Sequence, residues 1–492
     1  MANKLVSLLS GGINNNTSPL IIKDSENELI LNYRLDTVGA LTKRNGYDVF
    51  ATQPVAGKRV HGLFQYTNTS SSVETTQVMV VNNSGDTFSV IYYNNAGTWT
   101  TSKTDDTAVA TFTNFNRARF VTFLDYLFRV NGVDVVNTSN NVNGSVWGTT
   151  NAPTVITPSF IAVYEDRVYV ARNGVAAGSR VYYSGLPSSG AITWTTGTDF
   201  FDVNPDDGDE ITALENNGNR LLIFKNRAMY RWQFGQTEPD RIIGVGTPSQ
   251  ECVKTNFDLG ITFFANERGA YAYTGGRPKL ISRKIQKWFD AIPAADLDDM
   301  AADTDADHYY LYLSDSMTVD GRTYTNVMAV YTISLNAWVI YTLNTPIRVM
   351  NKLIQSGAED IYFGSSNGRT YQWDIGTGDD SGGASGNTAT PIAAEVITKE
   401  HMLSFPKKTH LNHIDIIASQ RVGAKVSYSV DRNVDFIPLG ELIDRVMRKR
   451  LAAKEIQTIR LRLSDNSFGQ SIIEGYNIEH TPIDKEDAGD TV

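Results

Sequence analysis

Short apolar runs separated by turn residues are clearest in DGDEITALENNGNRLLIFKNRAMYRWQFG, Asp207–Gly235. An apolar run precedes the pair Asn217-Gly218, and two further apolar or aromatic runs follow it. In a strand, successive side chains point to opposite faces, and Asn-Gly permits the positive φ angles of a tight hairpin. This stretch therefore predicts consecutive antiparallel strands joined by short turns.

The same unit recurs along the chain at long and roughly regular intervals. Its turn residues are Asp125, Asp166, Asn219, Asp258, Asp307 and Asp360, with gaps of 41, 53, 39, 49 and 53 residues. Four-stranded propeller blades have this length. We therefore predict six or seven blades between about Arg59 and Gly376. A string of unrelated hairpins in a sandwich is the alternative, and the regular spacing disfavours it.

The predicted fold class is all-β: a six- to seven-bladed β-propeller with an N-terminal arm and a small C-terminal β-sandwich domain. A Gly-, Ser- and Asp-rich stretch with little to bury separates the propeller from later runs such as AKVSYSVD, which are typical of strands. The predicted segments are residues 1–55 (N-terminal arm and leading strands), 56–376 (propeller), 377–391 (linker), 392–482 (β-sandwich) and 483–492 (acidic tail).

Two short helices are expected within this β-rich chain. Ser282–Ile292 places Ile285 and Trp288 on one face, and Ser282 is suited to the N-cap position. Gly440–Glu455 has its apolar residues loosely on one side and exposes a basic run. That run is interpreted either as a solvated helix face or as a contact with an acidic neighbouring subunit or with DNA.

Charge and cysteine content exclude several classes of protein. The net charge is -10, from 44 basic and 54 acidic residues. A protein that grips nucleic-acid phosphates over a wide surface needs a basic excess, so tight DNA or RNA binding is disfavoured. The single cysteine, Cys252, excludes an intrachain disulfide and a cysteine-based zinc site, and we expect it to be a small buried apolar residue. No signal peptide and no membrane-spanning helix is predicted.

Two acidic stretches have carboxylates at spacings that could hold a metal ion. Counting from Asp202, a calcium loop of the EF-hand type needs Gly at its sixth position and Glu at its twelfth, where this chain has Asp207 and Ala213. We therefore predict that Asp202–Glu210 is an acidic turn leading into a blade. DTDADH, Asp303–His308, could place alternate carboxylates on one strand face, but we favour a polar loop before a strand.

Sequence motifs for catalysis are missing. The chain has no phosphate-binding loop and no zinc-protease motif, and its Trp-containing turns lack the Asp and Gly of a sialidase-like repeat. His410 and His413 are three residues apart in an expected strand, so they should face opposite sides. We predict a protein that is not an enzyme, with no catalytic, cofactor-binding or metal-binding residues and no cofactor.

Several stretches taken in order resemble the propeller-type tail proteins of bacteriophages. The opening segment Gly11–Tyr47 carries the residues of this resemblance: Gly11, Gly12, Ser18, Pro19, Glu26, Asn32, Gly39, Arg44 and Gly46. The stretch quoted first is similar to a mid-propeller segment of the same family, as are NVMAVYTISLNAWVIYT and IYFGSSNGRTYQWDIG. FPKKTHLNHIDI, Phe405–Ile416, resembles the start of the family's C-terminal β-domain. The ordered set, rather than any one motif, is specific.

The resemblance implies a structural virion protein, the tail nozzle (tail tubular or stabilisation protein) of short-tailed phages. Copies of such proteins form a ring, usually sixfold, below the portal and adaptor, and carry surfaces for tail fibres or a tail tip. Assembly takes place in the cytoplasm of the host bacterium, without a membrane. Genomic DNA passes without specific binding, because an acidic bore repels its phosphates. The chain is rather short for this family.

Two other functions remain open from the sequence. One is a receptor- or glycan-binding propeller of the tail, about which the sequence motifs are silent. The other is a polysaccharide hydrolase, which the missing motifs disfavour.

Overall fold

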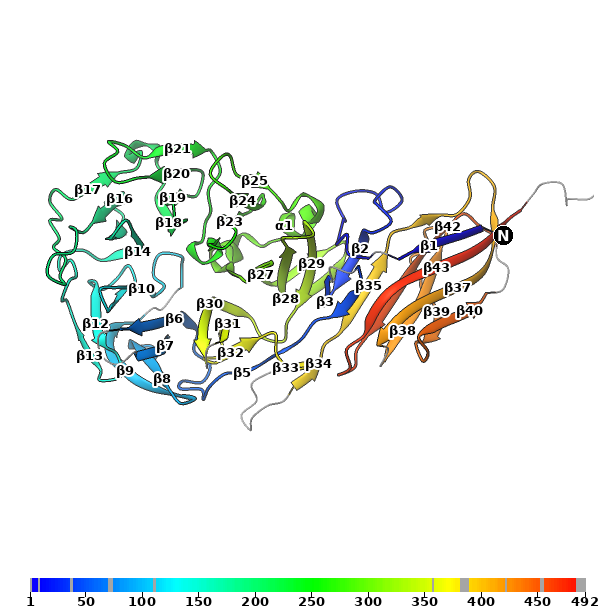
Figure 1. Ribbon diagram of the computed structural model, residues 1–492, viewed down its shortest axis with the longest axis horizontal. Helices are drawn as coiled ribbons and strands as arrows, with labels where there is room; N and C mark the ends of the chain where they lie inside the picture. Colours follow the sequence, from blue (N-terminus) through cyan, green and yellow to red (C-terminus); the bar gives the residue numbers. More distant parts are fainter. Residues whose placement is uncertain are drawn as a thin grey trace, which may run out of the picture.

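The computed structural model describes residues 2–7, 9–35, 39–69, 74–108, 112–355, 358–380, 389–420, 423–451 and 455–483. Figure 1 shows a wheel of small sheets that is joined at one side to an elongated pair of sheets. The acidic tail from residue 484 onward and residues 381–388 of the expected linker lie outside the described residues.

Five sheets of the wheel have four antiparallel strands each, in chain order. Blade 1 consists of β6 (Val60–Asn68), β7 (Glu74–Asn82), β8 (Phe88–Asn95) and β9 (Thr98–Thr107). Blade 2 consists of β10 (Arg119–Phe123), β11 (Tyr126–Val130), β12 (Asn137–Asn141) and β13 (Val146–Gly148). Blade 3 consists of β14 (Pro158–Tyr164), β15 (Arg167–Asn173), β16 (Ala177–Tyr183) and β17 (Phe200–Asp202). Blade 4 consists of β18 (Ile211–Asn216), β19 (Leu221–Lys225), β20 (Met229–Trp232) and β21 (Asp240–Ile243). Blade 5 consists of β22 (Lys254–Asn256), β23 (Ile261–Asn266), β24 (Gly269–Tyr273) and β25 (Lys279–Leu280).

Two more blades complete the wheel and belong to larger sheets. Blade 6 consists of β26 (Ala301–Thr304), β27 (His308–Val319), β28 (Arg322–Thr332) and β29 (Ala337–Thr342). Blade 7 consists of β30 (Ile347–Gln355), β31 (Ala358–Ser365), β32 (Thr370–Trp373) and β5 (Tyr47–Val49). The innermost strands contact one another in the cyclic order β6, β10, β14, β18, β22, β26, β30 and back to β6. In the described part of the chain the propeller therefore has seven blades, which confirms the predicted fold class.

The N-terminal arm closes the wheel. β5 pairs antiparallel with β32, so that Val49 lies opposite Tyr371 and Tyr47 opposite Trp373. A strand from the start of the chain thus completes the blade formed last, which fastens the ring without a disulfide.

Aromatic rings fill the spaces between neighbouring blades. Phe201 of blade 3 stacks on Trp232 of blade 4, with ring centroids 3.9 Å apart. Phe263 of blade 5 stacks in the same way on Tyr309 of blade 6, at 4.8 Å. Large rings that bury much apolar area on both sides explain why a 10% aromatic content goes with this architecture.

The predicted turns lie where the blade pattern needs them, with one exception. Five of the six turn residues connect the first and second strands of a blade, as Asp125 does between β10 and β11. Asp125 adopts φ 60° and Asp166 φ 54°, the left-handed conformation expected of such turns. The exception is Asp360, which lies inside β31 opposite Leu353.

The C-terminal module is a sandwich of two sheets, to which the N-terminal arm contributes (Figure 1). One sheet contains β1 (Ala2–Val6), β3 (Tyr33–Leu35), β4 (Leu41–Lys43), β37 (Thr409–Gln420), β40 (Val446–Arg450), β41 (Glu455–Ile456) and β43 (Ile472–Pro482). The other contains β2 (Asn27–Leu31), β35 (Ala394–Thr398), β36 (His401–Met402), β38 (Ala424–Val430), β39 (Ile437–Glu441) and β42 (Thr458–Asp465).

The sandwich and the propeller share one sheet. β2 pairs in parallel with β29 of blade 6 and antiparallel with β35, so a ten-stranded sheet runs from the wheel into the sandwich. Beside it, the buried Arg44 makes a bidentate ion pair with Asp379, at 2.8 and 2.6 Å. Because both backbone pairing and buried charges cross the junction, the two modules form one stiff body.

The segment expected to be a linker contains strands at both of its described ends. β33 (Gly378–Asp380) pairs in parallel with β5 and antiparallel with β34 (Ala389–Pro391). All three residues of β33 are buried. The structure thus differs from the sequence expectation, because Asp379 is the partner of Arg44 rather than a solvated linker residue.

Of the two expected helices, one is present. The 3-10 turn η3 (Arg283–Ile285) continues into α1 (Gln286–Asp290), and Ile285 and Trp288 are buried as predicted. Ser282 makes no side-chain cap; instead its hydroxyl accepts a hydrogen bond from the backbone of Ala270. Three more 3-10 turns are η1 (Pro205–Asp207), η2 (Gln250–Cys252) and η4 (Ala294–Asp299). Across the described ranges, no helix is long and apolar enough to span a membrane.

The second expected helix, Gly440–Glu455, is wrong. These residues end β39, form β40 and begin β41. Met447 of β40 is buried opposite Ile416 of β37, whereas Val446 on the other face is half exposed. Pairing with β37 overrides the helix preference of Leu, Met, Lys, Arg and Ala in this stretch.

Candidate functional site

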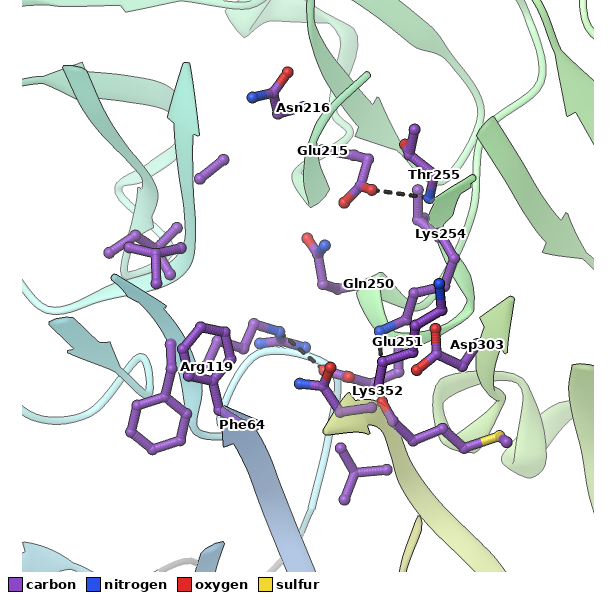
Figure 2. Close-up of a pocket in the computed structure, with 18 of the residues that line it drawn as sticks. Phe64, Arg119, Glu215, Asn216, Gln250, Glu251, Lys254, Thr255, Asp303 and Lys352 are labelled. Atoms are coloured by element: carbon purple, nitrogen blue, oxygen red, sulfur yellow. Dashed lines mark hydrogen bonds and ion pairs between the residues drawn. The ribbon is translucent and has the colours of Figure 1, made fainter. Parts of the chain in front are cut away.

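The propeller has a pocket on its axis, with a volume of about 460 Å³. Residues from all seven innermost strands or the segments just before them line it. Figure 2 shows polar and charged side chains from blades 2 and 4 to 7 converging on this space. A pocket at the meeting point of all blades is where a propeller can gather side chains that are far apart in sequence.

The segment 112–118, which leads into blade 2, closes one end of the bore. Asn114 is completely buried, and its amide donates to the carbonyl of Thr212 in blade 4, at 2.8 Å. Arg117 is 1% exposed and donates to the carbonyl of Arg348 in blade 7, at 3.2 Å. The segment therefore spans the axis from one side of the wheel to the other. The axial pocket is a blind hole rather than a passage.

An ion pair forms the floor of the pocket. Arg119 Nε lies 3.1 Å from Glu251 Oε1, and the same guanidinium donates to Asn114 Oδ1 at 2.8 Å and to the carbonyl of Ser159 at 3.0 Å. Burial alone would raise the pKa of Glu251, but the positive charges of Arg119 and Arg117 outweigh it and hold the pKa below its ordinary value. The floor is thus a fixed, internally neutralised pair.

A second set of charged side chains, on one wall of the axial pocket, is less completely paired. Burial raises the pKa of Glu215 to about 7, although its carboxylate accepts a hydrogen bond from the Thr255 backbone at 3.1 Å. Burial likewise raises the pKa of Asp303, which is 5% exposed. Burial would lower the pKa of Lys254, but the carboxylates of Asp303, Glu251 and Glu215 outweigh this effect and raise it. Lys254 thus lies near three acids, Asp303 and Glu215 on this wall and Glu251 in the floor.

The opposite wall, from blades 1 to 3, is apolar. Phe64 of blade 1 stacks on Phe120 of blade 2, with ring centroids 5.9 Å apart. The other apolar side chains on this side are Leu63, Ala118, Val121, Ile161, Ala162 and Val163. The pocket therefore presents an apolar face and a hydrogen-bonding face to anything that enters it.

The acidic turn Asp202–Glu210 is built around a buried lysine. Lys225 Nζ, completely buried, donates to Asp207 Oδ1 at 2.7 Å and at 3.0 Å to three further oxygens: Ser179 Oγ, Asn204 O and Asp209 O. The ammonium occupies the position that a bound cation would take in such an oxygen cage. Burial would raise the pKa of Asp207, but its contacts, chiefly with Lys225, outweigh this and lower it. The stretch leads into β18 of blade 4, as predicted.

DTDADH does not assemble into one site. Asp303 lines the axial pocket, whereas Asp305 accepts hydrogen bonds from the His308 backbone and the Tyr310 hydroxyl. Asp307 instead accepts from Ser334, at 2.6 Å. The favoured interpretation as a polar loop holds for Asp305 and Asp307, since β26 ends at Thr304. Asp303 itself belongs to that strand.

Cys252, His410 and His413 have defined surroundings in the structure. Cys252 is completely buried, as predicted, and burial raises the pKa of its thiol. His410 and His413 do not face opposite sides: a bulge between Leu411 and His413 shifts the alternation, so their partners are Thr481 and Glu479, which share a face. Within the described ranges no group of three or more His, Cys, Asp or Glu side chains could hold a metal ion.

A second candidate surface lies at the outer edge of the sandwich and is called the β39–β40 edge, residues 437–450. β39 pairs only with β38 and β40 only with β37 among the described strands, so each leaves one side unpaired. The side chain of Lys449 lies 3.7 Å from the position that a Cβ at Gly440 would take, which places the two strands next to each other. Ile443 is 79% exposed and Val446 50% exposed on this edge.

Comparisons with known proteins give no family assignment. No family model and no curated protein matches the chain. Among solved structures, the extracellular domain of a hybrid two-component system from B. thetaiotaomicron is similar with a TM-score of 0.47 and 9% identity, over 89% of this chain and 59% of that one. The N-terminal domain of Nup159 has a TM-score of 0.39 at 9% identity, over 70% of this chain and 98% of its own. The CNH domain of AfRom2 has a TM-score of 0.38 at 9% identity, over 67% of this chain and 99% of its own.

This chain thus spans about three fifths of the length of the first of these structures. Likenesses at this level have no bearing on what the chain binds or does.

Proposed function

We propose that this chain is a structural virion protein of a bacteriophage tail: a nozzle subunit that assembles with copies of itself into a ring, sixfold in the family it resembles. The ring forms part of the DNA ejection conduit below portal and adaptor and carries tail fibres or a tail tip. The chain does no catalysis in this role.

The observation that carries the proposal is the β39–β40 edge. Unpaired strand edges next to exposed apolar side chains are a ready surface for another chain, and stable monomers normally protect such edges. Lys449 and Arg450 on β40 are exposed and make no ion pair with any described residue. The edge is thus apolar, basic and open to a partner.

Charge distribution favours a second copy of the chain as that partner. Residues 392–482 hold 13 Lys and Arg against 11 Asp and Glu, whereas the rest of the chain holds 31 against 43. A basic sandwich edge on one copy complements an acidic surface on the next. Such a head-to-tail contact uses two different patches, so it generates a closed ring when the rotation between copies closes.

Stiffness is the second requirement of a ring subunit, and the junction between the modules supplies it. The ten-stranded sheet and the Arg44–Asp379 pair fix the sandwich to the wheel. Because segment 112–118 blocks the propeller axis, DNA cannot pass through a single subunit. In the proposed assembly the conduit lies between copies, where the overall acidic charge repels phosphates.

The test is the native mass of the purified chain, measured by light scattering after size exclusion, with charge-reversal variants. Self-association is expected, and Lys449→Glu with Arg450→Glu should abolish it. The matched control is Lys279→Glu, an exposed lysine on blade 5. Association that survives the double reversal refutes the assigned edge, whereas a chain that is monomeric at every concentration and salt refutes the ring. Mass spectrometry of purified phage particles tests the virion assignment directly.

A further inference from the structure

Beyond any role in a ring, we propose that the axial pocket binds one terminal unit of a neutral saccharide. The proposal does not depend on the structural function, because it stands on the lining of a blind hole inside a single copy. The pocket's volume of about 460 Å³ lies in the range of about 300–1,000 Å³ that small-molecule sites occupy.

The polar wall carries hydrogen-bonding capacity that the protein leaves unused. Asp303 accepts a bond from the Thr304 backbone at 2.8 Å through Oδ1, while its buried Oδ2 has no partner among the described residues. Among the residues that the structure describes, Lys254 Nζ has one long hydrogen bond, 3.5 Å, to the carbonyl of Met350. A buried carboxylate oxygen without a partner is costly, and a ligand would satisfy both this oxygen and the half-buried ammonium of Lys254.

The mixture of charges points to hydroxyl groups rather than to an ion. Lys254 and Lys352 stand near Asp303 and Glu215 on the same side of the space, as Figure 2 shows. An anionic ligand would meet the carboxylates and a cationic one the lysines. A hydroxyl group both donates and accepts, so neighbouring hydroxyls on one ring can bond Asp303 and Lys254 in turn.

The apolar wall suits the other face of a sugar ring. Phe64 and Phe120 present aromatic surface opposite the charged residues, and a pyranose has a C–H face as well as hydroxyl edges. Because the segment 112–118 closes the far end, a chain cannot thread through the pocket. The site therefore fits the end of a saccharide, not its middle.

The experiment is saturation-transfer difference NMR on the full chain with glucose, galactose, mannose and N-acetylglucosamine as probes. Glucuronate and glucosamine serve as matched charged probes. At least one neutral sugar should receive saturation on its ring C–H protons and bind more tightly than both charged probes. Asp303→Asn should weaken that binding about tenfold or more, since it alters a hydrogen bond to a charged group. Asp320→Asn, in the exposed turn after β27, should leave it unchanged.

A second variant keeps the test independent of Asp303's part in folding. Val163→Phe narrows the pocket from its apolar side, and it should abolish binding while the melting temperature stays close to that of the parent. No transfer to any neutral sugar overturns the proposal. So does tighter binding of glucuronate or glucosamine, or binding that persists in both Asp303→Asn and Val163→Phe.

Discussion

Replacing Lys225 by Met tests how the acidic turn before blade 4 is held. The substitution keeps most of the aliphatic stem and removes the ammonium, which donates to four oxygens between 2.7 and 3.0 Å while being completely buried. It leaves the Asp207 carboxylate and two backbone carbonyls without that donor. Asp207 Oδ1 cannot turn fully to water, because its side chain is only 22% exposed.

The magnitude follows from this geometry. Removing one partner of a buried charge pair costs about 3–5 kcal/mol. Since Asp207 retains partial access to water, we expect a loss near the lower end, roughly 3 kcal/mol of unfolding free energy. The matched control is Lys287→Met, which breaks an exposed pair with Asp320 whose side chains are 46% and 57% exposed. Exposed pairs of this kind contribute less than about 1 kcal/mol.

The assay is urea denaturation followed by tryptophan fluorescence, with both variants in parallel. Lys225→Met should unfold at clearly lower urea than Lys287→Met, and adding Asp207→Asn to Lys225→Met should recover part of the loss, because the carboxylate then no longer lacks a counter-charge. Equal effects of the two lysine substitutions would refute the account of the turn.

Three further predictions concern buried charges elsewhere. Burial raises the pKa of Glu215 from 4.5 to about 7, so between these pH values the folded protein binds a proton that the unfolded chain has lost, and stability falls as pH rises. The melting temperature of Glu215→Gln should therefore exceed that of the parent at pH 8 but not at pH 4. Burial and nearby arginines lower the pKa of His61 from 6.5 to about 3, so between these pH values the unfolded chain binds the extra proton, and stability falls as pH drops. The melting temperature of His61→Leu should therefore fall less steeply with decreasing pH than that of the parent. Arg44→Met removes the bidentate partner of Asp379 and should speed amide hydrogen exchange in β5 and β33, with β18 and β19 of blade 4 unchanged.

The blades could be predicted because their signal is local. A hairpin needs two apolar runs and a turn residue within about fifteen positions, and Asp125 and Asp166 are examples where such a turn adopts the left-handed conformation. The closing strand β5 could not be found in this way. Its three residues pair with β32, more than three hundred positions later, and only the finished wheel provides that partner.

The sandwich edge shows the opposite failure. Gly440–Glu455 is rich in good helix formers, so local preference and three-dimensional pairing disagree there. The structure resolves the conflict in favour of the strand, because Met447 is buried against β37 only in that conformation.

The axial pocket could not have been predicted from sequence, because its charged residues Glu215, Lys254 and Asp303 are far apart in the chain. Asp303 lies in a stretch whose sequence predicts a polar loop, and no local pattern marks Glu215 or Lys254. Each comes from a different blade and acquires its neighbours when the wheel closes. The plug formed by Asn114 and Arg117 likewise depends on contacts with blades 4 and 7.

Single-particle electron microscopy of the purified chain, imaged at low ionic strength, tests the central claim most directly. The account predicts closed rings in which the β39–β40 edge of each copy rests on the next copy, with a bore between copies and none through a propeller. Isolated two-module particles at every concentration, or rings in which this edge faces solvent, would contradict it.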